Sequence, residues 1–345
     1  MKTLITGANG YIGIHLAQTL LDRGYDVNAF LLEGTDAHDL PTLPVDIYTG
    51  DIRKAETIEQ ALTGCDTVFH LASIVGLWEK DPNIFHEVNV LGTDTLLKTC
   101  LRKGVKRVVV ISSCGAFGFP GPGQMLDETL DNGAKLTDPY EVSKYRQIDI
   151  SKKYLKYGLE VVFVYLSRVF GPGIKSNGNS ITGIFEGMLN GTWKIIPGDG
   201  KTVANYAFVH DVVNGMVLAM ERGEKGEGYI LGGENLNYDQ LFYHVEELTG
   251  RRFSLRKIPY PVMWFIGWLE EWRSRLMGSK PFVTVFGAKK FTSDCPISCQ
   301  KAQAQLGYRV TPTREALKFT LESLQMQPII PNQMSRMAGL EAQAA

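Results

Sequence analysis

The chain opens with Thr3-Leu4-Ile5-Thr6-Gly7-Ala8-Asn9-Gly10-Tyr11-Ile12-Gly13, where a short apolar run leads into three glycines separated by two residues each. Apolar residues then recur at helical spacing, at Ile12, Leu16 and Leu20. The stretch therefore predicts a strand, a tight turn and the start of a helix. Glycine at these positions permits a sharp turn, lets backbone N–H groups approach a pyrophosphate, and lets the helix pack close to the sheet.

An ordinary strand-to-helix turn can also carry such glycines, so the motif needs its context. Here it follows the first strand and precedes a helical pattern, which favours dinucleotide binding. Further apolar runs, separated by helical segments, predict strands at 25–34, 45–49, 66–70, 105–111 and 158–167. The sequence therefore predicts an α/β fold, a doubly wound parallel sheet of the Rossmann type.

We expect two interleaved domains and a tail. Residues 1–167 form an NAD(P)-binding Rossmann domain, to which residues 205–222 return as a helix. Residues 168–204 and 223–325 form a smaller C-terminal α/β substrate-binding domain. The polar and small residues at 326–345 predict a disordered tail.

Composition argues against several classes of protein. The 345 residues are 44% hydrophobic, enough for a large core, and the formal net charge of −1 gives no basic field for nucleic acid or acidic lipid. The five cysteines include no C-x-x-C pair, so neither a disulfide framework nor a metal site is expected. The longest strongly apolar run, 261–269, is far shorter than the roughly 20 residues of a membrane span. The sequence shows no signal-peptide pattern, so we expect a cytoplasmic protein with a small-molecule substrate.

The end of the second strand is expected to choose the cofactor, because it faces the adenosine ribose in this architecture. Leu31 and Leu32 occupy this end and Glu33 follows, with no arginine or lysine between Arg23 and Arg53. An acid there accepts a bond from the ribose 2′-OH and favours NAD, whereas an arginine favours NADP. The sequence thus favours NAD, with NADP and a merely solvated Glu33 left open.

Two further strand ends carry residues that suit a cofactor. Asp51, followed by Ile52, can bond the adenine amino group, or it can serve as the N-cap of the next helix. The loop after the fourth strand leaves room for the cofactor backbone with Leu71, Ala72 and Ser73.

A candidate proton-transfer site combines a serine pair with a tyrosine and a lysine. Ser112 and Ser113 end the valine-rich strand at 105–111, where the carboxyl ends of parallel strands form the cleft. Tyr140 and Lys144 are four residues apart and so share one face of a helix. The ammonium is expected to lower the pKa of the tyrosine, which can then pass a proton while a serine hydroxyl holds the substrate oxygen. An exposed helical Tyr/Lys pair is the structural alternative, and the order of glycine turn, serine pair and Tyr/Lys argues against it.

These motifs together resemble the extended short-chain dehydrogenase/reductase family, which is NAD-dependent epimerase/dehydratase-like. The resemblance covers residues 1–325 and is carried by residues 6–13, 50–52, 70–72, 89–93, 112–118, 140–144, 170–173, 229–233 and 294–308. Within the family, the chain is most similar to the dihydroflavonol-4-reductase-like and 3β-hydroxysteroid-dehydrogenase-like branch.

The resemblance implies a catalytic triad of Ser113, Tyr140 and Lys144. Ser113 and Tyr140 would hold the reacting oxygen, Tyr140 would pass the proton, and Lys144 would bond the nicotinamide ribose and tune Tyr140. Ser112 is the alternative serine, and Asn89 would either support a proton relay or bond backbone groups near its helix. The implied cofactor-binding residues are Gly7, Gly10, Tyr11, Ile12, Gly13, Glu33, Asp51, Ile52, Leu71, Ala72, Ser73, Ser112, Tyr140 and Lys144.

Two departures from the family pattern bear on the substrate. Nucleotide-sugar enzymes of the family typically carry G-D-G-x-x-x-R-D-F, whose arginine binds the diphosphate. In the segment that begins at Gly198, Ala204 stands in that place and cannot donate a charge-assisted bond, although Lys201 or Lys175 could substitute. Arg168 stands where relatives carry a small polar residue, and it either fixes an anionic or carbonyl group in the cleft or pairs with a surface carboxylate.

The expected substrate site is partly apolar. Trp78 and Phe117 are expected to form an apolar wall there, beside Arg168. A wide apolar stripe at 261–276 is expected to pack as core or to cover the substrate cleft, and the alternative is a lid that rests on a membrane surface or a dimer partner.

The sequence therefore predicts an NAD(P)-dependent oxidoreductase that interconverts a secondary alcohol and a ketone on a small or moderately apolar substrate by hydride transfer. A nucleotide-sugar epimerase or dehydratase with tightly bound NAD is the first alternative, and a non-catalytic cofactor-sensing protein is the second. By family analogy we expect a homodimer, and we expect no nucleic-acid partner and no transmembrane segment.

Overall fold

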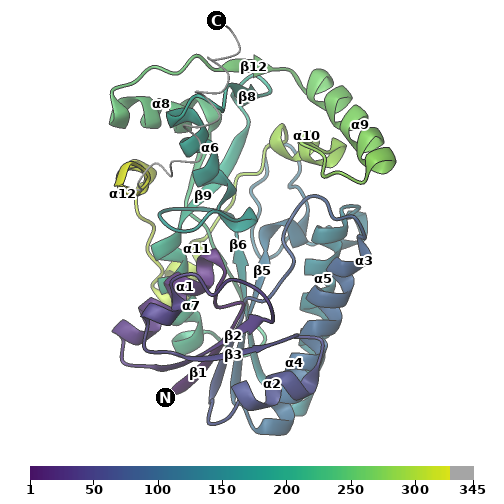
Figure 1. Cartoon of the computed structure of the whole chain (residues 1–345), viewed down its shortest axis with the longest axis vertical. Coiled ribbons are helices and arrows are strands. Elements are labelled where there is room, and N and C mark those ends of the chain that lie inside the picture. The colour runs from purple at the N-terminus through teal and green to yellow at the C-terminus, as the bar shows by residue number, and fades with distance from the viewer. Residues whose placement is uncertain (327–345) are drawn as a thin grey trace, which may run out of the picture.

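The computed structural model describes residues 1–326 and has a seven-stranded sheet at its centre (Figure 1). The strand order is β10-β6-β5-β4-β1-β2-β3, and every neighbouring pair is parallel. The strands are β1 (Lys2–Thr6), β2 (Asp26–Leu32), β3 (Asp46–Gly50), β4 (Thr67–His70), β5 (Arg107–Ser113), β6 (Glu160–Leu166), β7 (Arg168–Phe170), β8 (Ile195–Pro197), β9 (Val203–Phe208), β10 (Gly228–Leu231), β11 (Glu234–Asn237) and β12 (Arg256–Ile258). The α-helices are α1 (Tyr11–Asp22), α2 (Ala55–Ala61), α3 (Asn83–His86), α4 (Thr93–Lys103), α5 (Pro139–Lys152), α6 (Ser180–Leu189), α7 (Val209–Arg222), α8 (Tyr238–Thr249), α9 (Tyr260–Met277), α10 (Val285–Phe291), α11 (Gln300–Leu306) and α12 (Thr313–Met326). The short helical segments are the 3₁₀ turns η1 (Leu40–Thr42), η3 (Cys114–Phe117), η4 (Gly133–Lys135), η5 (Lys153–Tyr157) and η6 (Asn177–Asn179), and the π-helical turn η2 (Glu87–Gly92).

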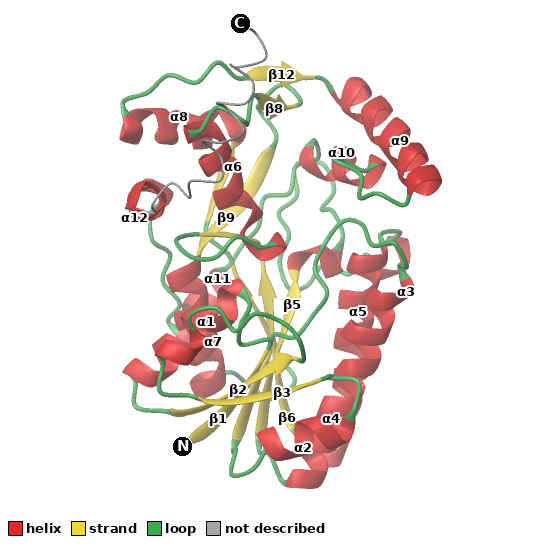
Figure 2. Ribbon diagram, viewed as in Figure 1, coloured by secondary structure: helices red, strands yellow, loops and turns green. Residues whose placement is uncertain are grey.

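Helices cover both faces of the main sheet (Figure 2). Helices α1, α7 and α11 lie on one side, and α2, α4 and α5 lie on the other. This arrangement confirms the predicted doubly wound α/β fold. The strand order reverses between β1 and β4, and in such folds ligands bind at the carboxyl ends of the strands at this point.

The central strands are apolar along their length because both of their faces are covered. In β5 the side chains of Val108, Val109 and Val110 are fully buried, and residues 161–164 of β6 are buried in the same way. Continuous runs of β-branched residues are typical of such strands, since they pack well on a pleated surface. This rigid core positions the residues at the carboxyl ends of β5 and β6.

The domain boundary predicted at residue 223 needs a correction. Strand β10 pairs in parallel with β6 from Gly228 to Leu231, so it belongs to the nucleotide-binding sheet and not to the substrate domain. The side chains of Tyr229, Ile230 and Leu231 are fully buried there, and their burial favours the return of the chain to the sheet edge after α7. The other predicted boundaries stay predictions.

The remaining strands form two small sheets beyond the carboxyl ends of the main strands. Strands β11, β9 and β7 form one, and β12 pairs with β8 in the other. Strands β8, β9 and β12 lie with α6, α8, α9 and α10 in the upper half of Figure 1. Within residues 1–326, no helix has the length and the apolar character needed to cross a membrane. The tail predicted at 326–345 lies outside the described residues, apart from Met326 at the end of α12.

Candidate active site

The glycine turn after β1 is too tight for larger side chains. Gly7 has a φ of +69°, and a Cβ atom there would lie 2.9 Å from the backbone nitrogen of Ala72. A Cβ on Gly13 would lie 2.4 Å from the carbonyl oxygen of Gly7, so the first turn of α1 presses against the glycine turn. Gly10 is the N-cap of α1 and offers the first N–H groups of the helix no side-chain bond. These N–H groups are therefore available to a phosphate, and the turn fits a dinucleotide.

Two predicted cofactor residues, Tyr11 and Ile12, begin α1. The ring of Tyr11 is 3% exposed, and a Cβ on Gly171 would lie 3.0 Å from its hydroxyl oxygen. Among residues 1–326, that hydroxyl has no hydrogen-bond partner. The ring thus points into the protein beneath the loop after β7, and only the backbone N–H of Tyr11 is placed for a phosphate.

The three residues predicted to bind the adenosine end of the cofactor differ from one another in exposure and in hydrogen bonding. Glu33 is exposed just after β2, and Ile52 is buried. The carboxylate of Asp51 accepts bonds from the guanidinium of Arg53 at 2.6 Å and from its backbone N–H at 2.9 Å. The Arg53 guanidinium holds the pKa of Asp51 below its usual range. Lys54 occupies the N-cap of α2, so the capping role that we considered for Asp51 is wrong.

The loop after β4 joins the predicted cofactor residues to the catalytic candidates. Leu71 and Ala72 are half-buried, and the N–H of Ala72 donates at 3.2 Å to the threonine hydroxyl at the end of β1. The hydroxyl of Ser73 donates to the amide oxygen of Asn89 at 3.0 Å. The same hydroxyl accepts a bond from the ammonium of Lys144 at 3.4 Å. The loop after β4 therefore contacts both Asn89 and Lys144.

Asn89 lies in the π-helical turn η2 and is fully buried. Its Nδ2 donates to the carbonyl oxygen of Ile74 at 3.0 Å and to the hydroxyl of Ser143 at 2.9 Å, and its Oδ1 accepts from the N–H of Ile74 at 2.8 Å. Together with the bond from Ser73, these bonds use both N–H donors and both acceptor sites of the Asn89 amide. This geometry favours the backbone-bonding alternative for Asn89, although π turns are frequent at functional sites.

The two serines at the end of β5 meet different partners. Ser112 is 3% exposed, and its hydroxyl donates to the backbone carbonyl of Lys144 at 3.3 Å. The hydroxyl of Ser113 accepts from the N–H of Gly115 at 3.1 Å. Of the two serines, Ser113 is the one whose hydroxyl acts on the pKa of Tyr140, which it lowers. Its catalytic role stays a prediction.

Tyr140 and Lys144 lie one turn apart on α5. Burial raises the pKa of Tyr140 to about 12, although the Ser113 hydroxyl acts in the opposite direction. Burial lowers the pKa of Lys144 to about 7, and its ammonium donates to the carbonyl oxygen of Ile111 at 2.9 Å. The prediction that Lys144 lowers the pKa of Tyr140 is therefore wrong. Burial dominates because it disfavours the charged form of each group, and the ammonium is bonded to the backbone instead.

An ion pair that the sequence did not predict lies beside Tyr140. The ammonium of Lys290 is 2.7 Å from the Oε1 atom of Glu141, a residue that is 3% exposed. A Cβ on Gly115 would lie 2.9 Å from the same oxygen, so the carboxylate fills the space next to η3. Lys290 comes from α10, and no local sequence signal links it to α5.

Two of the three predicted substrate residues are aromatic and half-buried. Trp78 lies in the loop before α3, and Phe117 ends η3. The ring of Phe117 packs edge-on against Tyr165, with 4.7 Å between the ring centroids. The apolar wall that these rings would form against a substrate stays a prediction.

The third predicted substrate residue, Arg168, is not the surface partner of a carboxylate. Its guanidinium donates to the hydroxyl of Tyr238 at 3.1 Å and to the carbonyl oxygen of Lys290 at 3.3 Å. It also lies over the rings of Tyr206 and Phe291, at 5.9 and 5.7 Å from their centroids. The surface alternative for Arg168 is therefore wrong, because a phenol, a carbonyl and aromatic faces hold the charge.

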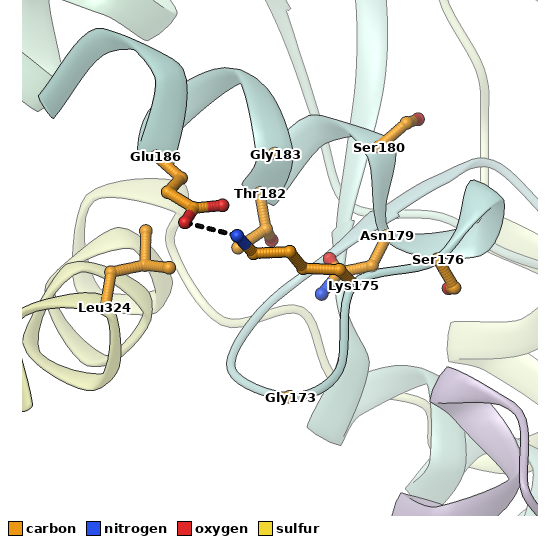
Figure 3. A pocket seen from close by; sticks show the side chains of 9 residues that line it. All are labelled: Gly173, Lys175, Ser176, Asn179, Ser180, Thr182, Gly183, Glu186 and Leu324. Carbon is orange, nitrogen blue, oxygen red and sulfur yellow. Dashed lines mark ion pairs between the residues drawn. The ribbon is translucent and has the colours of Figure 1, made fainter. Parts of the chain in front are cut away.

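A pocket of about 120 Å³ opens beside the loop after β7 (Figure 3). It is lined by Gly173, Lys175, Ser176, Asn179, Ser180, Thr182, Gly183, Glu186 and Leu324, of which Lys175 is the residue considered above for a diphosphate. Within it, the ammonium of Lys175 lies 2.6 Å from the carboxylate of Glu186. Lys201 is paired in the same way with Asp239 at 3.0 Å, and Ala204 is buried in β9. Each position considered for a diphosphate is thus apolar or already paired.

The fold and the glycine turn define a dinucleotide-binding enzyme of the Rossmann class. The model of the NAD dependent epimerase/dehydratase family matches residues 3–232, and the chain belongs to this family. The chain is 32% identical over 275 residues to sterol demethylase protein B of Methylococcus capsulatus, across 79% of this chain and 81% of that protein. It is 28% identical over 337 residues to a 3 beta-hydroxysteroid dehydrogenase/Delta 5→4-isomerase of Mycobacterium tuberculosis, across 92% and 88%.

The solved structures include a similar fold. The UDP-glucose 4-epimerase of Thermus thermophilus in complex with NAD matches with a TM-score of 0.77 and 25% identity, over 95% of this chain and all of that one. Family membership confirms the resemblance found in the motifs. It also confirms that the protein is an NAD-dependent enzyme, and the glycine turn described above fits that cofactor.

Proposed function

We propose that this enzyme interconverts a secondary alcohol and a ketone on a small or moderately apolar substrate. The placement of Ser113 at the carboxyl end of β5, where its hydroxyl acts on the pKa of the Tyr140 phenol, carries the proposal. A phenol and an alcohol placed together can hold the oxygen of a carbonyl or carbinol and exchange a proton with it. Two relatives support an apolar substrate, since their names refer to a sterol and to a 3β-hydroxysteroid.

Each of the three residues has a separate task in the proposed reaction. Bound NAD supplies the acceptor of a hydride, or its donor when reduced. Ser113 holds the substrate oxygen, and the protonated Tyr140 donates its Oη proton to the ketone oxygen during reduction. In the reverse direction, the phenolate form of Tyr140 takes the proton of the alcohol. Lys144 is the proposed partner of the nicotinamide ribose, and its bond to Ser73, at 3.4 Å, is long enough to be given up easily.

A nucleotide-sugar epimerase or dehydratase is the second candidate. The likeness to a UDP-glucose 4-epimerase supports it. The buried Ala204 weighs against it, because alanine cannot donate a charge-assisted bond to a diphosphate. Lys175 and Lys201 already pair with carboxylates, so a diphosphate would have to compete with these partners.

Turnover assays separate the candidates. The enzyme is incubated with NAD and secondary alcohols that range from small aliphatic alcohols to sterols, and the reduced cofactor is followed by its absorbance. UDP-glucose is tested in parallel for conversion without net reduction of NAD. Oxidation of an alcohol that Tyr140→Phe abolishes supports the proposal. Conversion of the nucleotide sugar would replace it with the second candidate, and NAD binding without any turnover would favour a cofactor-sensing protein.

A further inference from the structure

The apolar stripe predicted at 261–276 forms helix α9, and most of it faces outward. More than half of the large apolar side chains exposed in residues 1–326 fall within residues 260–282. We define the apolar face of α9 as Val262, Trp264, Phe265, Ile266, Trp268, Leu269 and Trp272, each 38–56% exposed. The prediction that this stripe packs as core is therefore wrong.

The inner side of α9 explains why its apolar side chains point outward. Gly267 lies so close to the segment before α10 that a Cβ would be 2.9 Å from the carbonyl carbon of Thr284. The carboxylates of Glu270 and Glu271 accept bonds of 2.9 and 2.8 Å from backbone N–H groups just before and at the start of α10. The small and polar residues of α9 thus face the protein, which is the reverse of an ordinary surface helix.

The apolar face is wider than a contact with one neighbouring helix requires. At about 100° per residue, its seven side chains spread over about 200° of the helix circumference. A helix that packs on one partner needs an apolar stripe of about 100°. A flat, extended apolar phase covers such a face better than a second helix does.

The charge around α9 differs from that of the whole chain. Segment 250–281 contains seven basic residues, Arg251, Arg252, Arg256, Lys257, Arg273, Arg275 and Lys280, and two acidic ones, Glu270 and Glu271. The chain as a whole has a net charge of −1. Four of the seven have carboxylate partners: Lys257 and Arg252 pair with α8, at 2.9 and 2.7 Å, and Arg273 and Arg275 pair with Glu270 and Glu271, at 2.9 and 4.0 Å. Segment 260–269 has no charged residue. The net charge therefore conceals a local basic surplus at both ends of the apolar face.

We propose that α9 docks on the surface of an anionic lipid bilayer, with its apolar face in the interfacial region. Tryptophan is favoured at this depth, because its ring is amphipathic, and the face carries three of the chain's five tryptophans. Arginine and lysine at the two ends can reach anionic headgroups while their stems stay in the apolar layer. The helix lies on the bilayer and does not cross it.

The docked helix is joined to the candidate active site. It packs on α10, where Lys290 binds Glu141 beside Tyr140, and a Cβ on Gly287 would lie 3.2 Å from Leu77. Leu77 adjoins Trp78, a residue of the predicted apolar wall. If the proposed function holds, an apolar substrate could enter from the lipid, but docking itself does not depend on that function.

Vesicle sedimentation of the full chain tests the proposal. The probes are vesicles of phosphatidylcholine alone and of phosphatidylcholine mixed with phosphatidylglycerol. We expect binding to the mixed vesicles, a blue shift of tryptophan fluorescence, and weaker binding at high salt. Trp268→Glu/Trp272→Glu should weaken binding at least tenfold, while Tyr157→Glu, which changes an exposed aromatic residue on the α5–β6 connection, should not. NAD binding by each variant checks that it is folded.

Four results would overturn the proposal. They are no binding to either vesicle, equal binding to both, unchanged binding of Trp268→Glu/Trp272→Glu, or a lipid-free dimer that this variant converts to monomers. The last result would assign the apolar face to a second copy of the chain. Failure of the alcohol assays, by contrast, would leave vesicle binding unaffected, so the two proposals fail separately.

Discussion

The ammonium of Lys290 and the carboxylate of Glu141 lie 2.7 Å apart, although 148 residues separate them along the chain (290 − 141 − 1). Glu141 directly follows Tyr140 on α5, and Lys290 lies on α10. The ion pair therefore links α10, on which α9 packs, to α5, which carries Tyr140.

Removing the positive partner of this pair should destabilise the fold. Lys290→Met leaves the buried carboxylate of Glu141 unpaired, and we expect a loss of about 2 kcal/mol in the free energy of unfolding, less than for a fully buried pair because Lys290 is partly exposed. The double variant Glu141→Gln/Lys290→Met should recover most of the loss. Urea unfolding measures both, and a double variant as unstable as the single one contradicts the explanation.

Tyr140→Phe should remove turnover but not cofactor binding. The variant keeps the ring and loses the hydroxyl proposed to pass the proton, so we expect kcat to fall by about 10²–10⁴-fold. An NAD titration should give an unchanged Kd. Ser112→Ala serves as the control, since that hydroxyl bonds only a backbone carbonyl, and equal losses in the two variants would contradict the assignment of Ser113.

The stability of the protein should depend on pH through Lys144. Its pKa is about 7 in the folded chain, against an ordinary value of 10.5. Below about pH 7 both states carry the charge, and the buried ammonium destabilises the fold in full. Between about pH 7 and 10.5 the unfolded chain binds the extra proton, so stability should rise by up to about 1.4 kcal/mol per pH unit relative to Lys144→Met. Unfolding in urea at several pH values without added cofactor measures this difference, and a flat difference rules out the buried ammonium.

Gly13→Ala should damage both folding and cofactor binding. The new methyl group would lie 2.4 Å from the Gly7 carbonyl oxygen, so the turn or α1 must move. We expect at least a tenfold weaker NAD affinity. Gly183→Ala on α6 is the matched control, because a Cβ there meets no atom within 4 Å and alanine favours a helix by about 1 kcal/mol. Thermal melts with and without NAD separate the two effects.

A nucleoside diphosphate should bind weakly. Because Lys175 and Lys201 are paired with carboxylates and Ala204 is buried, we expect UDP to leave the melting temperature of the NAD-loaded enzyme unchanged. Inorganic pyrophosphate controls for non-specific anion binding. A clear rise of the melting temperature with UDP, but not with pyrophosphate, would instead support the nucleotide-sugar candidate.

Local signals in the sequence were sufficient for the fold and the cofactor. The apolar strand, the three glycines and the helix of residues 3–22 are neighbours in the chain, so their spacing alone predicts the geometry of the turn. The same holds for Tyr140 and Lys144, which are one helical turn apart. The predicted homodimer and cytoplasmic location involve other molecules, and they stay predictions.

The errors share a physical cause, which is that distant segments decide them. Burial by several elements sets the pKa of Tyr140, and its neighbour Lys144 does not. The outward direction of α9 depends on Gly267 and on α10, so periodicity shows an apolar stripe but not which side of it is covered.

The π turn at Glu87–Gly92 has a consequence for how the chain tolerates length changes. A π turn accommodates one residue more than an α turn, so deleting one residue there would straighten the helix and rotate the segment before it by about 100°. The amide of Asn89 would then lose its hydrogen bonds to Ser73 and Ile74 in the loop after β4. The one extra residue of the π turn thus determines the direction in which the Asn89 side chain points. Deleting a residue from this helix would therefore be more harmful than most substitutions along it.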